Sequence, residues 1–257
     1  MGENKRFFNL GIATDYYIAL GLKYKGFYEF PYKKFYWCHN NFLFAEIPTP
    51  NAQNKEKVDT MDSNFTGEPE KVLIEVENKE NAEENKANEE GNEKIEGKQE
   101  DSESEDKIKI IPKNLTELDR LAYVVAAIEN DCQTVPNGSF KLTPQHELRR
   151  EEYFKGLKCE ELIDIKNYSH FRNVQTEEKK DFIERDDAIF YTTFLDPIEV
   201  DQPQGAWTFH LDSTKSLVNL RNLKWPGYIA FHKAGSSYFG GIYIGDGLIN
   251  ADLPFML

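Results

Sequence analysis

The fold is decided by residues 205–257, which have the sequence GAWTFHLDSTKSLVNLRNLKWPGYIAFHKAGSSYFGGIYIGDGLINADLPFML. Trp207, Phe209 and Leu211 alternate with smaller or polar residues, which is the period-two pattern of a half-buried strand. Polar or glycine-containing turns separate the later apolar runs, which we expect to be strands over residues 217–223, 229–233 and 238–244. The pattern predicts an antiparallel C-terminal β-meander.

The chain ends in three large apolar residues, Phe255, Met256 and Leu257. Chain ends are usually polar and frayed. We therefore expect this tail to dock against the meander.

The first fifth of the chain also has the pattern of strands. A β-hairpin is predicted over residues 6–25, where two apolar, aromatic-rich runs flank Thr14 and Asp15. Residues 35–47 are expected to add one or two strands around Trp37.

Two main helices are expected in the middle of the chain. Asn114 can cap the first, over residues 114–130, with Glu117 three positions on in a capping-box arrangement. Its apolar residues recur at helical spacing, at Leu118, Leu121, Val125 and Ile128. The second helix is expected over residues 159–168. Strands followed by helices and again by strands favour an α+β fold with antiparallel sheets over a doubly wound sheet.

Composition divides the chain into consecutive units. They are an N-terminal hairpin and strand unit (1–50), a loop-rich connection (51–74), an acidic low-complexity loop (75–106), a helical and mixed region (107–200) and the meander (201–257). The acidic loop lacks the large apolar residues needed to offset its ordering entropy, so we expect it to be disordered. Residues 1–50 and 107–257 are expected to form one compact domain.

The charge balance argues against two classes of partner. The chain has 31 basic and 45 acidic residues, which gives −14. Residues 75–106 hold 14 acids and 4 lysines, a net of −10, so the remainder carries −4. An acidic chain without a concentrated basic face is a poor candidate for binding nucleic acid or an anionic membrane.

The cysteines and the apolar runs point to a cytosolic protein. Cys38, Cys132 and Cys159 are odd in number and far apart, which is untypical of a secreted disulfide framework. The first residues contain no apolar stretch of signal-peptide length. The longest apolar run, residues 121–128, is too short to span a bilayer.

No metal or cofactor site is predicted. Cys38 and His39 are adjacent on an expected strand and point to opposite faces, so they are poorly placed to share one ion. The glycines between residues 240 and 247 are not followed by the helix that a phosphate-cradling loop requires. Turn and bulge positions in a sheet are the better interpretation of these glycines.

No catalytic residues are predicted either. Ser236 and Ser237 lie close in sequence to His232, but they lack the strand-to-helix context of a nucleophile elbow. A hydrolase built on these residues is the most distant hypothesis, and we expect the chain not to be an enzyme.

Aromatic residues crowd the meander and its tail. They fall on both faces of the expected strands, and a sheet that is apolar on both faces must be covered on the second, by its own helices or by another chain. Aromatic residues are also enriched in protein interfaces. The candidate partner interface comprises Trp225, Tyr228, Phe231, Tyr238, Phe239, Tyr243 and Phe255.

Several segments resemble one known family. They are residues 223–227 (LKWPG), residues 238–245 (YFGGIYIG), the ending DLPFML and the early DYYIA at residues 15–19. In order and spacing they resemble the radial spoke head protein 9 family, which is related to radial spoke head proteins 4 and 6. The likeness covers most of the chain outside the acidic loop.

The resemblance implies a non-catalytic subunit of the spoke head in the axoneme of motile cilia and flagella. It implies assembly with proteins of the 4 and 6 type and with the spoke stalk into a large hetero-oligomer. Such a subunit helps to transmit central-pair signals that regulate dynein-driven bending. The residues by themselves leave open an alternative, a cytosolic β-rich module that binds a carbohydrate or a peptide with the same aromatic side chains.

Overall fold

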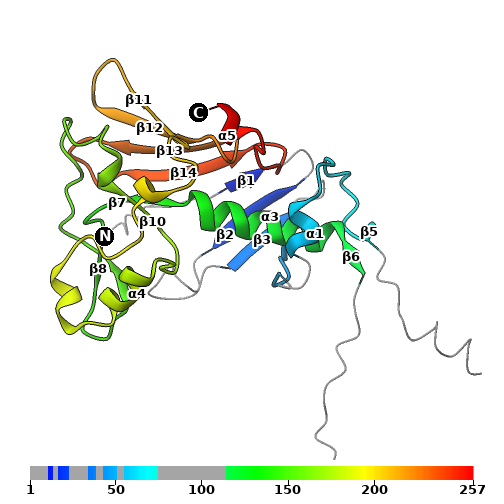
Figure 1. Ribbon diagram of the computed structural model, residues 1–257, viewed down its shortest axis with the longest axis horizontal. Helices are drawn as coiled ribbons and strands as arrows, with labels where there is room; N and C mark the ends of the chain where they lie inside the picture. The colour runs from blue at the N-terminus through cyan, green and yellow to red at the C-terminus, as the bar shows by residue number, and fades with distance from the viewer. Residues whose placement is uncertain are drawn as a thin grey trace, which may run out of the picture.

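The computed structural model of the chain describes residues 11–13, 17–22, 34–38, 43–50, 55–74 and 114–256 (Figure 1). Its main feature is a sheet with the strand order β11-β12-β13-β14-β1-β2-β3-β4. The strands are β1 Gly11–Ala13, β2 Ile18–Leu22, β3 Lys34–Cys38, β4 Ala45–Glu46, β11 Trp207–Leu211, β12 Leu217–Asn222, β13 Tyr228–Lys233 and β14 Phe239–Ile244. The sheet therefore joins both ends of the chain.

The C-terminal half of this sheet is the predicted meander. β11 to β14 pair antiparallel in sequence order, with Leu220 opposite both Phe209 and Ala230. β1 pairs with the far side of β14 in parallel, with Ile12 opposite Tyr243. The α+β fold and the meander are confirmed. The parallel pairing was not predicted, because local periodicity carries no information about which distant strands become neighbours.

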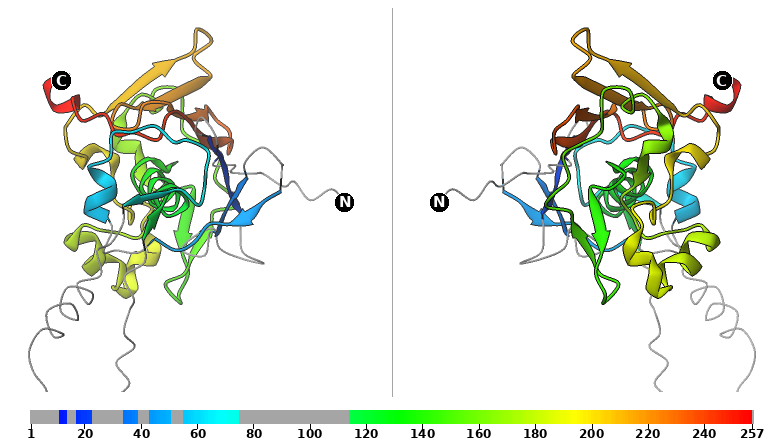
Figure 2. Two further views of the ribbon diagram at one scale, coloured as in Figure 1. Left: turned by 90° about the vertical axis from the view of Figure 1, so that its right-hand side faces the viewer. Right: turned by 90° about the vertical axis from the view of Figure 1, so that its left-hand side faces the viewer.

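Helix α3 (Glu117–Cys132) crosses one face of the sheet and confirms the first predicted helix (Figures 1 and 2). Its cap is Thr116 rather than Asn114. Thr116 Oγ1 accepts a hydrogen bond from the Asp119 N–H at 3.3 Å, and the Asp119 carboxylate accepts one from the Thr116 N–H at 3.1 Å. The residues of α3 that are fully buried against the sheet include Leu121, Val125 and Ile128.

The second helix, predicted over residues 159–168, is wrong. The segment forms turns and a short 3-10 helix, η2 (Ile165–Asn167), and then β10 (Tyr168–His170) pairs with β7 (Thr134–Pro136). The Asp164 carboxylate accepts a hydrogen bond from the Lys166 N–H at 3.0 Å and closes η2 locally. The spacing of Leu162 and Tyr168 resembled that of a helix. In the structure Leu162 lies in a turn and Tyr168 in a strand, and both side chains are buried.

The other regular elements of the described chain are short. They are α1 (Lys55–Asp59), β5 (Val72–Ile74), β6 (Leu115–Thr116), β8 (Phe140–Leu142), β9 (Leu148–Arg150), α4 (Glu177–Ile183), η3 (Asp186–Phe190), η4 (Ile198–Val200) and α5 (Leu253–Met256). β5 pairs with β6, so the strands on either side of the acidic loop are neighbours. The loop itself, residues 75–106, lies outside the described residues.

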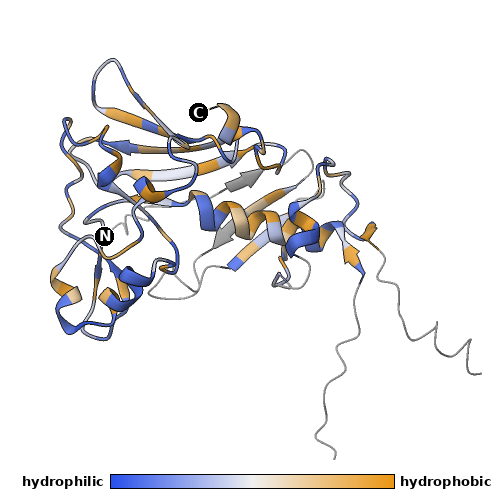
Figure 3. Ribbon diagram, in the orientation of Figure 1, coloured by the Kyte–Doolittle hydropathy of each residue, from blue (hydrophilic) through white to orange (hydrophobic). Residues whose placement is uncertain are grey.

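Two clusters of buried side chains form the core. The larger lies between α3 and the main sheet and includes Leu121, Val218 and Tyr243. The smaller lies under β8 and includes Phe140, Phe194 and Phe239. Figure 3 shows hydrophobic residues along α3 and along the strands beside it.

The tail docks by one residue. Leu253 is buried in the larger cluster, whereas Phe255 is 88% exposed and Met256 is 71% exposed. The expectation that the last apolar residues pack against the meander is therefore wrong for these two. They follow Leu253 in the short helix α5, which turns their side chains away from the core.

Candidate functional site: an apolar outer face of the sheet

The predicted aromatic interface divides between the two faces of the sheet. Trp225, Tyr228, Phe239 and Tyr243 are buried in the core of this chain. Side chains alternate along β13 and β14, and Tyr228, Phe239 and Tyr243 lie on the inner side of the sheet. Tyr228 and Tyr243 pack in the larger core cluster, and Phe239 packs in the smaller one. Burial removes Tyr228, Phe239 and Tyr243 from the surface that a partner can reach.

The other predicted residues are at the surface. Phe231 is 42% exposed and Tyr238 is 56% exposed, and both lie toward one end of the β13–β14 hairpin. Phe255 lies in α5, away from that hairpin in sequence. The structure therefore brings Phe231 and Tyr238 together and leaves Phe255 as a separate exposed residue.

Around Phe231 the sheet presents an apolar surface away from α3, which we call the outer face. It consists of the exposed side chains of Ile18, Ile229, Phe231, Ile242 and Ile244. The strand register makes them neighbours, because Ile229 lies opposite Ile242. Ile244 and Ile18 lie opposite the same residue of β1, the central strand between them.

Gly240 leaves room for the Phe231 ring. It lies opposite Gly240, and a Cβ placed on that residue would come within 3.3 Å of the Phe231 ring. The bare backbone of Gly240 lets the ring lie over β14 and extend the outer face. Sequence reasoning singled out Phe231 but missed the four isoleucines. Period-two alternation along β13 and β14 carried the signal that could have found Ile229, Ile242 and Ile244.

The outer face ends at a polar border. Arg221 of β12 is exposed and lies opposite Ile229, and Asn219 lies opposite Phe231. Lys233 is exposed at the end of β13. An apolar centre with a polar rim is the composition of protein interfaces.

A groove of about 720 Å³ lies on the other side of the sheet, along α3. Its lining includes residues of α1, of α3 and of the segment before α5, together with Trp225. Lys55, Asp59 and Asp62 contribute charges of both signs to this lining. The groove therefore has no strong preference for an anionic or a cationic ligand.

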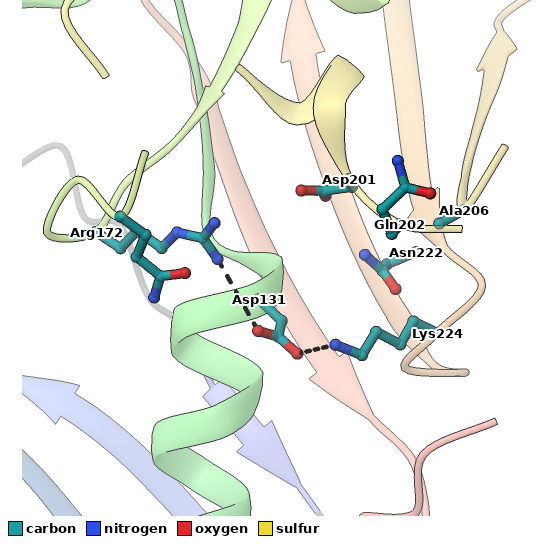
Figure 4. Close-up of a pocket in the computed structure, with 8 residues that line it drawn as sticks. Asp131, Arg172, Asp201, Gln202, Ala206, Asn222 and Lys224 are labelled. Atoms are coloured by element: carbon teal, nitrogen blue, oxygen red, sulfur yellow. Dashed lines mark hydrogen bonds and ion pairs between the residues drawn. The ribbon is translucent and has the colours of Figure 1, made fainter. Parts of the chain in front are cut away.

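A polar pocket of about 190 Å³ adjoins this groove (Figure 4). Lys224 Nζ lies 2.7 Å from Asp131 Oδ2, and Trp225 Nε1 donates a hydrogen bond to the same oxygen at 3.0 Å. Arg172 lies 4.0 Å from the other carboxylate oxygen. Burial tends to raise the pKa of Asp131, but the hydrogen bonds and the charge of Lys224 lower it overall. This network ties the end of α3 to the meander.

His232 and Ser236, the residues of the hydrolase hypothesis, contact backbone groups of this chain. His232 is fully buried, and its Nε2 accepts a hydrogen bond from the Leu157 N–H at 3.1 Å. Its Nδ1 lies 3.2 Å from the Tyr238 carbonyl oxygen, and Ser236 Oγ accepts a hydrogen bond from the Tyr238 N–H. These contacts hold the loop between β13 and β14 in place.

The described residues contain neither a metal-binding cluster nor a membrane-spanning helix. No cluster of three or more His, Cys, Asp or Glu side chains is arranged there to hold a metal ion. Within the same residues, no helix has the length and apolar character needed to cross a membrane.

Comparison with known proteins gives a consistent result. The chain is 30% identical to the radial spoke head protein 9 homolog of Mus musculus over 248 residues, which cover 96% of this chain and 82% of the mouse protein. The Homo sapiens homolog is 29% identical with the same coverage. The Danio rerio homolog is 38% identical over 141 residues, which cover 55% of this chain and 51% of that protein.

No protein-family model matches the chain. The match to the mouse protein nevertheless extends over nearly the whole sequence and over most of that relative. By this similarity, the chain belongs to the radial spoke head protein 9 family.

Proposed function

We propose that this protein is a non-catalytic structural subunit of the radial spoke head in the cytoskeleton of motile cilia and flagella. It assembles there with other spoke-head proteins, including those of the 4 and 6 type, and with the spoke stalk. Through these contacts it helps to transmit central-pair signals that regulate dynein-driven bending. Membership of the radial spoke head protein 9 family supports the location of this protein in the spoke head.

The observation that carries the proposal is the outer face. Ile18, Ile229, Phe231, Ile242 and Ile244 form an exposed apolar surface on one face of the sheet. Contiguous apolar surfaces with polar rims mark interaction sites on soluble proteins. Such a surface suits a subunit that acts by binding other proteins.

The first test is affinity purification of the tagged chain from ciliated cells, followed by mass spectrometry. We expect spoke-head and stalk proteins in fixed proportion. The double variant Phe231→Asp/Ile242→Asp should reduce their recovery by about tenfold, because it places charge at the centre of an apolar interface.

The matched control is Tyr153→Asp/Phe190→Asp, which changes two exposed aromatic residues away from the outer face. This variant should recover the partners like the unmodified protein. If the unmodified chain recovers no spoke proteins, the proposed function fails. If the outer-face variant recovers them fully, the function stands but the interface lies elsewhere.

The alternative, a module that binds a peptide or a carbohydrate, is favoured by one observation. The groove along α3 is large enough for a peptide segment and has Trp225 in its lining. Isothermal titration of the isolated chain with peptide and oligosaccharide libraries tests this function. A saturable site that Ala126→Trp removes, by filling the groove lining, would support it.

A further inference from the structure

The main sheet has two open edges of different character. At one edge, β4 is only two residues long and is followed by Pro48 and Pro50. At the other, β11 is five residues long and contains no proline or formally charged residue. Short strands, prolines and charges are the usual protection of sheet edges against pairing. β11 lacks them, and Figures 1 and 2 show it at the margin of the sheet.

Backbone geometry fixes which groups of β11 face this open edge. Leu223 N–H donates to the Ala206 carbonyl at 2.8 Å, and Asp212 N–H donates to the Leu217 carbonyl at 2.9 Å. Hydrogen-bonded pairs alternate in an antiparallel ladder, so Thr208 and His210 also bond to β12.

Trp207, Phe209 and Leu211 consequently direct their N–H and C=O groups away from β12. In the described part of the chain, none of these backbone groups has a backbone partner on that side.

The side chains of β11 also suit an additional strand. Phe209 and Leu211 are half-buried on the inner side, where Phe209 packs against the ring of Tyr168 at a centroid distance of 5.7 Å. Thr208 and His210 are exposed on the outer side. A strand placed beside β11 would cover the exposed parts of Phe209 and Leu211 without burying a formal charge.

We propose that β11 pairs with β11 of a second copy of this chain, antiparallel about a two-fold axis at Phe209. This register sets Phe209 opposite Phe209 of the second copy and Trp207 opposite Leu211. All three residues then form hydrogen-bonded pairs, with about six hydrogen bonds in total. The two sheets become one continuous sheet, and both α3 layers lie on the same side of it.

Self-complementarity favours a second copy as the occupant. A two-fold interface sets the same strand against itself, so a net charge on that strand would meet the same charge on the copy. β11 carries no formal charge, and its donors and acceptors are centred on the middle residue of the strand. The pairing uses the sheet edge and leaves the outer face free, so it adds a contact between subunits to the proposed function and does not depend on the partners bound there.

Disulfide trapping of the full chain tests the pairing. The two-fold axis places Thr208 opposite His210 of the second copy, as a non-hydrogen-bonded pair whose Cβ atoms would lie about 4.5–5.5 Å apart. That separation is close to what a disulfide needs. The background is Cys159→Ser, which removes the exposed cysteine and leaves the buried Cys38 and Cys132. Thr208→Cys and His210→Cys proteins are purified separately, mixed and oxidised.

We expect a disulfide-linked dimer in the mixture and at least about tenfold less with either protein alone, because identical positions lie about 7–8 Å apart on the diagonal. Arg221→Cys, on the same face but one strand from the edge, should not link to His210→Cys. Adding Phe209→Pro, which removes a donor at the centre of the pairing, should reduce linking by about tenfold.

Linking no greater in the mixture than with either protein alone would overturn the pairing. If Phe209→Pro removes a spoke protein in the affinity purification and the mixture shows no excess linking, then the edge binds a strand of that protein rather than a second copy. Neither result bears on the outer-face variants, so the proposed function is tested separately.

Discussion

At the scale of single residues, His232 shows how a polar side chain is held neutral in the core. Burial lowers its pKa to about 4, against the opposing effect of the hydrogen bond to the Tyr238 carbonyl. With Nε2 accepting from the Leu157 N–H, the proton of the neutral ring is on Nδ1. The side chain thereby joins the β13–β14 loop to residue 157.

This lowered pKa makes stability depend on pH. Between the folded pKa of about 4 and the ordinary value of 6.5, the unfolded chain binds a proton that the folded chain does not. The free energy of unfolding therefore falls as the pH decreases through this window. From pH 7 to pH 5, the free energy of unfolding measured with urea should fall by about 2 kcal/mol more in the unmodified protein than in His232→Gln.

The matched control is His210→Gln, at the exposed histidine of β11. It should retain the pH dependence of the unmodified protein. Equal pH dependence in His232→Gln and the unmodified protein would show that His232 is not the group responsible.

At the scale of elements, β14 shows how one strand supports two different faces. Gly240 and Gly241 are adjacent, and each accommodates an aromatic ring from β13. On the outer side the Phe231 ring lies over Gly240. On the inner side the Tyr228 hydroxyl and ring lie against Gly241, within the core. Glycine is required here by the close approach of a side chain, and neither residue has a positive φ.

The two glycines should respond differently to the same substitution. In Gly241→Ala the new methyl group would collide with the buried Tyr228 side chain. We therefore expect the free energy of unfolding to fall by about 1–3 kcal/mol. In Gly240→Ala the half-exposed Phe231 ring can move outward, so the loss should be below about 1 kcal/mol. Urea denaturation of both variants measures the difference, and equal losses would contradict this account of the two faces.

At the scale of the whole molecule, Glu117 ties the early strands to α3. Its buried carboxylate accepts hydrogen bonds from the Tyr17 hydroxyl at 2.8 Å, from the Thr66 N–H at 3.0 Å and from the Gly67 N–H at 2.8 Å. Burial tends to raise the pKa of Glu117, but these bonds lower it overall. The beginning of the sheet and residues 66–67 are thus joined at one carboxylate.

We therefore expect residues 1–50 and 107–257 to be one folding unit. A chain without residues 1–50 loses the pairing of β1 with β14 and the buried Tyr17, so calorimetry should show no cooperative transition. A chain without residues 79–106 loses almost no apolar residues, and its Tm should stay within about 4 °C of the full chain. A normal transition in the first truncation would show that the units are independent.

The sequence by itself determined the elements whose pattern is local. The alternation from Trp207 to Leu211 predicted β11, and the apolar spacing of α3 predicted that helix, because both periods follow from backbone geometry alone. The same reasoning failed at residues 159–168, where helical spacing comes from a turn and a strand that contribute to the same core. The family was also recognisable from the sequence, because its motifs are short segments of consecutive residues.

Tertiary structure alone decided which of two equivalent-looking faces is the surface. Tyr228 and Phe231 are both aromatic residues of β13, and no local property distinguishes them. The position of α3 buries Tyr228 and leaves Phe231 exposed among isoleucines from β2, β13 and β14. That surface exists because β1 pairs with β14, and such a long-range pairing depends on the free energy of the whole core rather than on any one segment.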